Sequence, residues 1–224
     1  FWHWVYTPVD PLNGPCDVSS EGFGVQLLDH PNGQGYWTLT SEGQITPFGA
    51  VDYFGAPEAP EIPHTWVGMA ATHSGNGYWV LQSTGTVASF GDAPNWGDAT
   101  ISFESGPCVG IAGYGGDAGY WVGTRDGSIQ VFGNAPSLLQ GSVDPGDAPV
   151  VALVSSTDRN GFWTLREDGA LGLFNAPFLG NLAGVNLSSI ATGMTATLSG
   201  EGYWILLEDG TIYPFGDAAN YGSV

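Results

Sequence analysis

Acidic and imidazole side chains recur next to an aromatic triplet that repeats along the chain. The residues ahead of the triplet are His30, His73, Asp117, Asp158 and Glu201, and Asp92 and Asp217 lie in turns that follow it. Carboxylate oxygens are hard ligands that suit Ca²⁺, and they accept hydrogen bonds from sugar hydroxyls. The set is therefore a candidate polar ring for a glycan or for Ca²⁺, and we expect no other cofactor. Turn formation is the competing interpretation, because Asp side chains also bond their own backbone in loops.

Tryptophan offers a second kind of candidate site. Five of the nine tryptophans occupy the repeated triplet, whereas Trp2, Trp4, Trp66 and Trp96 do not. An indole ring outside a repeated core position can stack on a sugar or contact a protein. Trp66 and Trp96 are therefore candidate ligand-binding residues, with packing beneath loops as the alternative.

Catalytic patterns are scarce. A glycosidase needs two carboxylates facing each other across a site, and the positions expected nearest the axis hold Gly, Ala, Gln and aliphatic residues. The sequence has no G-x-S-x-G motif and no H-x-x-x-H pair, which serine hydrolases and many zinc enzymes use. We therefore expect a protein that is not an enzyme, with a glycoside hydrolase as a distant alternative.

Charge and cysteine content restrict the partners. The chain has 224 residues, with three Lys plus Arg against 22 Asp plus Glu and a formal net charge of −19. This balance argues against nucleic acid and anionic membranes as partners, and no run of eighteen apolar residues exists to insert into a bilayer. Cys16 and Cys108 are compatible with one disulfide in an oxidising compartment or with two buried free thiols.

The elements that would position these residues come from an internal repeat. Its triplets begin at Gly35, Gly77, Gly119, Gly161 and Gly202, at steps of 42, 42, 42 and 41 residues. A turn glycine keeps the same spacing at Gly43, Gly85, Gly127, Gly169 and Gly210. Such regular self-similarity is typical of repeat architectures.

Each repeat reads as short antiparallel strands. In the last copy, strands at 203–207 and 211–215 flank Asp209-Gly210, a strong hairpin signal. A further apolar run precedes each triplet, as at 109–112. A fourth strand is expected at Tyr53–Phe54, Trp96, Leu138–Leu139, Phe178–Leu179 and Tyr221.

Side-chain direction selects the fold. Neighbouring strand residues point to opposite faces, so the Tyr and Trp of each triplet make both faces of every small sheet apolar. Small sheets covered on both sides by identical neighbours are propeller blades. We predict an all-β fold, a five-bladed β-propeller over residues 22–224, with blades at about 22–64, 65–106, 107–147, 148–187 and 188–224. The narrow axis explains the small residues Gly68, Gly110, Ala152 and Gly193, which Gln26 does not match.

Residues 1–21 lie outside the repeat as an N-terminal arm. Its β-prone aromatic residues are Phe1, Trp2, Trp4 and Tyr6. The arm would add an edge strand to a blade of this chain or to the sheet of a neighbour. In the first case Cys16 would come within reach of Cys108, which makes this pair the disulfide candidate.

The repeat resembles the tandem G-Y-W…D-G…F-G-D-A arrays of secreted proteins from high-GC Gram-positive (actinobacterial) organisms. Residues 202–218 look like a near-complete copy, and the likeness spans all five units, with departures at Thr84, Asn134 and Asn175. A weaker, architectural similarity is to five-bladed propeller lectins. The first resemblance implies a secreted, non-catalytic repeat module, and the second implies ligand sites repeated around the disc.

Together these observations predict a non-enzymatic extracellular or cell-surface module for binding or adhesion. Its expected partner is a cell-wall glycan or a surface protein, met through the loop faces. The alternative is a structural subunit of a larger extracellular assembly that uses the aromatic arm.

Overall fold

The computed structural model describes residues 9–10, 14–15, 22–61, 64–137 and 148–223. Within these residues the regular elements are all strands, and no helix is long and apolar enough to cross a membrane. A short pair, β1 (Val9–Asp10) and β2 (Gly14–Pro15), precedes the repeats. The arm residues Phe1, Trp2, Trp4 and Tyr6, together with Cys16 and the predicted strand at Leu138–Leu139, lie outside the described residues.

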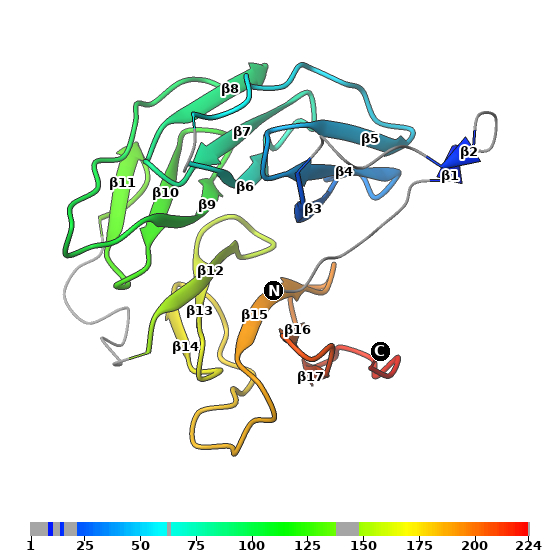
Figure 1. Cartoon of the computed structure of the whole chain (residues 1–224), viewed down its shortest axis with the longest axis vertical. Helices are drawn as coiled ribbons and strands as arrows, with labels where there is room; N and C mark the ends of the chain where they lie inside the picture. The colour runs from blue at the N-terminus through cyan, green and yellow to red at the C-terminus, as the bar shows by residue number, and fades with distance from the viewer. Residues whose placement is uncertain (1–8, 11–13, 16–21, 62–63, 138–147, 224) are drawn as a thin grey trace.

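Five antiparallel sheets of three strands follow, one for each repeat (Figure 1). Their strands, in chain order, are β3 (Gly24–Asp29), β4 (Gly35–Thr40) and β5 (Ile45–Gly49) in blade 1; β6 (Trp66–Ala71), β7 (Gly77–Gln82) and β8 (Val87–Gly91) in blade 2; β9 (Cys108–Tyr114), β10 (Gly119–Thr124) and β11 (Ile129–Gly133) in blade 3; β12 (Val150–Ser155), β13 (Phe162–Arg166) and β14 (Leu171–Phe174) in blade 4; β15 (Ala191–Ala196), β16 (Gly202–Leu207) and β17 (Ile212–Gly216) in blade 5. The predicted five-bladed β-propeller of about 42-residue repeats is therefore confirmed.

The hairpin turns form where the Asp-Gly signals predicted them. In blade 5 the Asp209 carboxylate accepts a hydrogen bond from the Thr211 amide at 2.9 Å, and Gly210 has a φ of 85°. A left-handed φ of this kind favours glycine. The same arrangement recurs at Asp126 with Ser128 and at Asp168 with Ala170, so these aspartates define turns.

Aromatic contacts join each blade to the next. The Trp ring of one triplet packs against the Tyr or Phe ring of the following triplet, with centroid distances of 5.2–5.7 Å. The pairs are Trp37–Tyr78, Trp79–Tyr120, Trp121–Phe162 and Trp163–Tyr203. All eight rings are fully buried. Four of the five triplet tryptophans therefore form the core between blades, whereas Trp204 of blade 5 is only partly buried.

The predicted fourth strand does not form in any described repeat. The segments after β5, β8, β14 and β17 are irregular, and side chains of two blades donate hydrogen bonds to carbonyls of the segments after β5, β8 and β14. Trp79 Nε1, for example, donates to Pro94 O at 2.7 Å within its own blade. The Tyr120 hydroxyl of the next blade donates to Gly97 O in the same segment. The segments after β5, β8 and β14 are each held in this way between a Trp of their own blade and a Tyr of the next, whereas the segment after β17 is held by Trp204 of its own blade.

The inner strands approach one another closely at the axis. A Cβ added to Gly110 would lie 2.9 Å from Leu153 in the next blade, so this position excludes a side chain. Gln26, which breaks the small-residue pattern, uses its amide to bind a neighbouring strand. Its Nε2 donates to Met69 O at 3.1 Å, and its Oε1 accepts from Met69 N at 2.7 Å.

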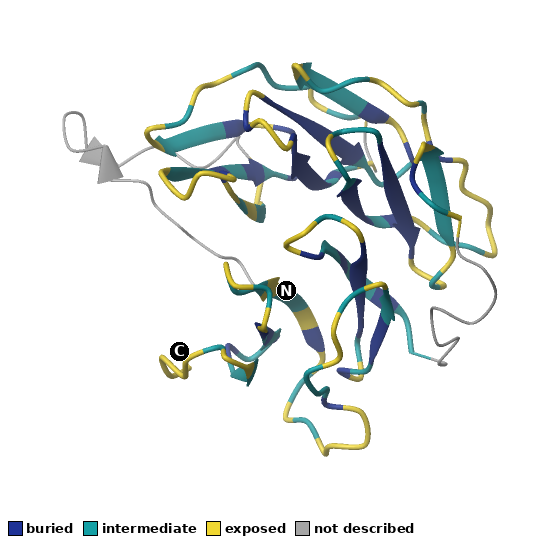
Figure 2. Cartoon of the chain, turned by 180° about the vertical axis from the view of Figure 1, so that it is seen from behind, coloured by how far each residue is buried: buried dark blue, intermediate teal, exposed yellow. Residues whose placement is uncertain are grey.

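The five blades form an open arc. Inner strands pack in the sequence β3, β6, β9, β12 and β15, and no comparable packing joins β15 to β3 among the described residues. Figure 1 shows the first and last blades separated at this point. Buried residues concentrate in the middle blades (Figure 2).

Candidate functional site

The candidate residues gather at one end of the disc, which we call the apical face. It consists of the loops at 30–34, 72–76, 115–118, 156–161 and 197–201, which join the inner to the middle strand of each blade. Asp92 and Asp217 follow the outer strands β8 and β17 and reach the same end. The shared strand polarity explains why one face collects these residues.

Hydrogen bonds link successive apical loops. His30 Nε2 lies 3.1 Å from Gly75 O in the next blade, and the His73 amide donates to Asp117 Oδ1 at 2.7 Å. Gly115 N then donates to Arg159 O at 2.9 Å. Finally, the Thr157 hydroxyl approaches Thr197 O at 3.4 Å. The apical face is therefore a continuous surface held across all five blades.

Three of the predicted ring carboxylates are occupied by hydrogen bonds within the chain. Asp92 accepts from Thr72 at 2.8 Å and from Ser74 at 2.6 Å. Thr197 and Ser199 contact Asp217 in the same way, at 2.9 and 2.6 Å. Asp158 accepts from Ser156 at 2.6 Å and from the Asn160 amide at 3.0 Å, and the bond from Ser156 is the largest cause of its lowered pKa. The turn interpretation accounts for Asp158, whereas Asp92 and Asp217 are held by hydroxyls of the preceding apical loop.

Two other predicted residues are buried and inaccessible to a ligand. His30 is 8% exposed; besides its contact with Gly75, its Nδ1 accepts from the Asn32 amide at 3.1 Å. Trp66 is 5% exposed and donates from Nε1 to Glu58 O at 3.1 Å. It begins β6 at the opposite end of the blade, because an inner strand runs toward the apical face. Glu201 is exposed, and its carbonyl oxygen accepts from the Asp217 amide.

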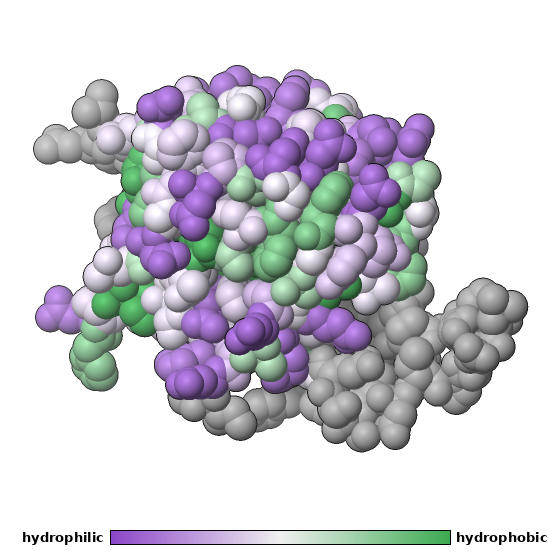
Figure 3. Space-filling model, turned by 90° about the horizontal axis from the view of Figure 1, so that it is seen from above, coloured by the Kyte–Doolittle hydropathy of each residue, from purple (hydrophilic) through white to green (hydrophobic). Residues whose placement is uncertain are grey.

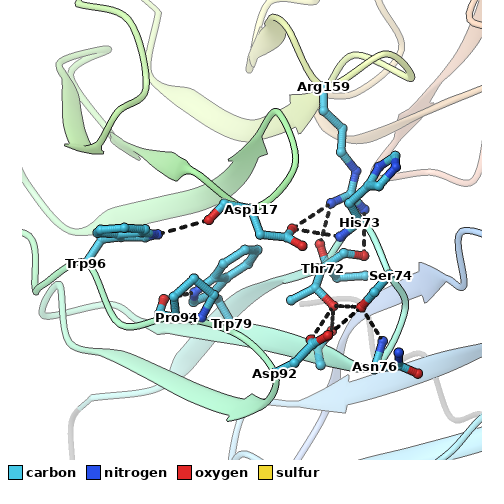
Figure 4. Close-up of polar contacts among 12 residues, drawn as sticks. Thr72, His73, Ser74, Asn76, Trp79, Asp92, Pro94, Trp96, Asp117 and Arg159 are labelled. Carbon is cyan, nitrogen blue, oxygen red and sulfur yellow. Dashed lines mark hydrogen bonds and ion pairs between the residues drawn. The ribbon is translucent and has the colours of Figure 1, made fainter.

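The structure brings the remaining predicted residues together around an arginine. We call His73, Trp96, Asp117 and Arg159 the apical cluster (Figure 4). Arg159 in blade 4 donates to Ala71 O at 2.8 Å and to Thr72 O at 3.2 Å, both in blade 2. Its Nη1 also lies 3.6 Å from Asp117 Oδ1 of blade 3. The guanidinium thus ties three blades together.

Burial and charge act in opposite directions on this guanidinium. Desolvation lowers the pKa of Arg159, and the Asp117 carboxylate opposes that shift. Both residues also have left-handed backbones, with φ of 56° at Arg159 and 66° at Asp117. Non-glycine residues adopt this conformation uncommonly. The surrounding hydrogen bonds therefore hold two strained positions at the centre of the cluster.

His73 and Trp96 are the parts of the cluster that a partner can reach. The indole Nε1 of Trp96 donates to Asp117 O at 3.2 Å, while 39% of the residue remains exposed. His73 is bound through its backbone amide to Asp117 and is exposed. The exposed Trp96 and His73 therefore lie on opposite sides of Asp117, whose own side chain is only 19% exposed (Figure 4).

Metal-ligand geometry is not present in the described part of the chain. No group of three or more His, Cys, Asp or Glu residues there is arranged to hold an ion. Ca²⁺ binding stays an untested expectation, and the apical carboxylates above are engaged by hydroxyl and amide donors.

A shallow depression lies away from the apical face, beside the hairpin turn of blade 3. It has a volume of about 300 Å³ and is lined by residues that include Glu104, Arg125 and Asp126. Arg125 in this depression pairs with Glu167 of the next blade at 2.5 Å. The depression is open to solvent.

Cys108 begins β9 as a buried free thiol, and its predicted disulfide partner Cys16 lies outside the described residues. Burial raises the pKa of this thiol to about 11. In a Cys16→Ser variant the thiolate fraction at pH 8 would then be about one in a thousand, and thiolates are the reactive form. We expect negligible reaction with a disulfide reagent in the folded chain and full reaction in urea. Rapid labelling of the folded variant would contradict this assignment.

Comparisons with known proteins support the fold. No family model and no curated protein matches the sequence. Among solved structures, the chain is similar to the β-propeller domain of Cps50 (Swd1) from Myceliophteria thermophila, with a TM-score of 0.61 and 12% identity. The match covers 89% of this chain and 68% of that one. At this identity the likeness establishes a β-propeller and nothing finer.

Sequence reasoning missed Arg159. The available signal was its rarity, because the chain has only three basic side chains of the Lys and Arg type. An arginine in an apical loop of so acidic a chain is expected to bind carboxylates and backbone carbonyls of the neighbouring loops.

Proposed function

We propose that this chain is a non-enzymatic extracellular binding module that recognises a surface protein through its apical face. The observation that carries the proposal is the apical cluster, in which Arg159 and Asp117 fix an exposed Trp96 and His73 across three blades. Rigid aromatic groups on a pre-organised surface are favourable anchors, because little conformational entropy is lost on binding. The resemblance of the repeat to secreted arrays supports an extracellular location.

Charge indicates the kind of surface that would fit. All three arginines are engaged within the chain: Arg125 with Glu167, Arg159 with the apical loops, and Arg166 with Ala148 O. The net charge of −19 is therefore presented to solvent with few free cations. Complementary charge accelerates association and is screened by salt. A partner with a basic or neutral contact surface is expected.

The test compares binding of candidate surface proteins to the wild-type chain and to variants of the accessible residues. Trp96→Ala should weaken binding by about tenfold or more, as for an aromatic anchor, and His73→Ala by less. Phe103→Ala is the matched control, because Phe103 is a fully exposed aromatic residue outside the apical cluster. Affinity should also fall as salt is raised. Equal binding by Trp96→Ala and wild type, with unchanged circular dichroism, would reject the apical face as the site.

A glycan is the second candidate partner, favoured by a different observation. The irregular segments after the outer strands each expose an aromatic residue: Tyr53, Trp96, Phe178 and Tyr221. In the view from above, hydrophobic patches on the rim lie between hydrophilic margins (Figure 3). Exposed aromatic faces suit stacking on sugar rings. Binding to cell-wall polysaccharide that is lost in Tyr53→Ala and Phe178→Ala, and retained in His73→Ala, would favour this candidate.

A further inference from the structure

One position of the repeat makes different contacts in blade 2. The segment after the outer strand has a bulky residue directly before its left-handed glycine in four blades: Phe54, Trp96, Leu179 and Tyr221. Phe54 and Leu179 pack against the buried clusters between blades. Trp96 instead reaches across the boundary to blade 3, where its Nε1 donates to Asp117 O at 3.2 Å (Figure 4). Trp96 is therefore held on the surface of the boundary between blades 2 and 3.

The indole of Trp96 rests with one face on the backbone of blade 3. A Cβ added to Gly133 would lie 2.9 Å from Cδ2 of Trp96. Because Cδ2 is a ring-fusion carbon enclosed by other ring atoms, this close approach is onto the face of the indole and not onto its edge. The residue is nevertheless 39% exposed, so solvent reaches the opposite face.

Hydrogen bonds fix the chain on either side of Trp96. Asn95 Oδ1 accepts from the Gly97 amide at 2.8 Å, and Gly97 O accepts from the hydroxyl of the buried Tyr120 in blade 3. Together with the bond from Nε1, these contacts hold both the backbone and the ring edge of Trp96. A ring fixed in this way loses little conformational entropy when a ligand stacks on it.

The residue after Gly133 offers an amide that is not engaged within the chain. In blades 2 and 5 the equivalent residues are Asp92 and Asp217, whose carboxylates accept from apical-loop hydroxyls. Blade 3 has the exposed Asn134 at this position, and its apical loop lacks the Thr and Ser that bind Asp92. The Asn134 backbone donates to Ala118 O at 2.7 Å, but its side-chain amide makes no hydrogen bond with the described part of the chain. This uncharged group can therefore both donate to and accept from a ligand.

We propose that Trp96 and Asn134 form a subsite for a neutral sugar ring. Asn134 directly follows the glycine on which the indole rests, which places its backbone beside the ring. The open face of the indole stacks on the sugar ring, and the Asn134 amide binds the sugar hydroxyls. An anionic sugar would be repelled by the net charge of −19, so the expected ligand is neutral.

This inference rests on the proposed function, because it names the chemical group that the exposed Trp96 contacts. The sugar ring has two possible sources, a glycan attached to a surface protein and a free polysaccharide. The same stacking and hydrogen bonding serve both sources, so they are separated by experiment.

Isothermal titration with soluble, neutral oligosaccharides of glucose, mannose, galactose and N-acetylglucosamine tests the subsite. At least one of them should bind the wild-type chain saturably, with an affinity that is the same at low and high salt, because no charge pair is formed. Trp96→Ala should weaken this binding by about tenfold or more, as for an aromatic anchor. Asn134→Ala should weaken it by about fivefold, the effect of one hydrogen bond.

Two variants serve as matched controls. Asn186→Ala removes an exposed asparagine from the loop between blades 4 and 5, and Phe103→Ala removes a fully exposed aromatic residue outside the subsite. Both should bind the oligosaccharide like wild type, and circular dichroism checks that every variant folds. Failure of the wild-type chain to bind any of the oligosaccharides would overturn the subsite, and so would equal binding by Trp96→Ala and wild type.

Deglycosylation of a protein partner separates this inference from the proposed function. A partner bound through its glycan should lose binding when the glycan is removed enzymatically, whereas a polysaccharide source binds with no protein present. A surface protein whose binding falls in Trp96→Ala, but is unchanged by deglycosylation and in Asn134→Ala, would keep the apical face as the binding site. That result would reject the sugar subsite alone.

Discussion

Replacing Trp121 by alanine is expected to lower the free energy of unfolding by about 4 kcal/mol. The Trp121 ring is fully buried and contacts Phe162 and Phe174 of the next blade, with centroid distances of 5.2 and 5.9 Å. Its Nε1 also donates to Pro136 O at 3.1 Å, which holds the segment after β11. The substitution therefore opens a cavity between blades 3 and 4 and releases that segment. Urea unfolding followed by circular dichroism measures the loss.

The repeat supplies a matched control at the equivalent position of blade 5. Trp204→Ala removes the same side chain and the same kind of hydrogen bond, from Nε1 to Ala219 O at 2.8 Å. Because this ring is only partly buried and no further blade covers it among the described residues, the expected loss is only about 1–2 kcal/mol. Equal losses for the two variants would contradict the open arc.

A second variant separates packing from hydrogen bonding. Trp121→Phe retains an aromatic ring against Phe162 but cannot donate to Pro136 O. A net hydrogen bond is worth about 1 kcal/mol, and the smaller ring also leaves some space, so we expect a loss between those of the other two variants. A loss as large as that of Trp121→Ala would show that the clamp on the irregular segment, rather than burial, dominates.

The architecture was accessible from sequence because the repeat encodes its own interfaces. Tyr78 and Trp79 are adjacent, so they point to opposite faces, and each face then needs an apolar neighbour. The turn at Asp209-Gly210 follows in the same way from local backbone preferences. These signals are either local in the sequence or repeated along it, so they can be recognised without knowledge of the fold.

The prediction of a fourth strand is wrong because aromatic residues in this segment pack, and its carbonyls accept clamping bonds, without forming a ladder. The indole of Trp79 and the hydroxyl of Tyr120 bind carbonyls of the segment that contains Trp96. In this segment, side-chain donors take the place of the backbone hydrogen bonds that a paired strand would make. Such bonds run between residues 15 to 23 positions apart, and neither is visible in a local pattern.

The candidate site could be predicted from the sequence only in part, because its contacts also join residues that are far apart in the chain. The sequence identifies which loops share a face, and His73, Asp117 and Trp96 do meet there. It does not reveal which carboxylates already accept hydrogen bonds within the chain, as Asp92 does from Thr72 and Ser74 of another loop. Arg159 binds carbonyls 87 and 88 residues away, a contact that depends on the curvature of the whole arc.

The last expected result is a steep loss of stability at alkaline pH. Burial raises the pKa of Tyr78 and of Tyr120 to about 12, although hydrogen bonds to backbone groups oppose the shift. In the unfolded chain these phenols titrate near pH 10. Between about pH 10 and 12 the folded state therefore retains protons that the unfolded state has lost. The contribution of these two tyrosines to the free energy of unfolding is therefore constant below about pH 9 and falls by about 1.4 kcal/mol per pH unit for each tyrosine between about pH 10 and 12.

Urea titrations at a series of alkaline pH values, with tyrosinate absorbance as a second signal, measure this slope. Tyr78→Phe should reduce stability at neutral pH, because Gly55 O loses its donor, but it should also make the alkaline slope shallower by one tyrosine. Tyr221→Phe is the control, since Tyr221 is 87% exposed and should leave the slope unchanged. The buried Tyr78 hydroxyl stabilises the fold at neutral pH, where it is protonated, and destabilises it at alkaline pH, where it would have to ionise. Tyr78→Phe is therefore expected to lower stability at neutral pH and to reduce the further loss at alkaline pH. An unchanged alkaline slope in Tyr78→Phe would show that this phenol titrates in the folded chain as it does in the unfolded one.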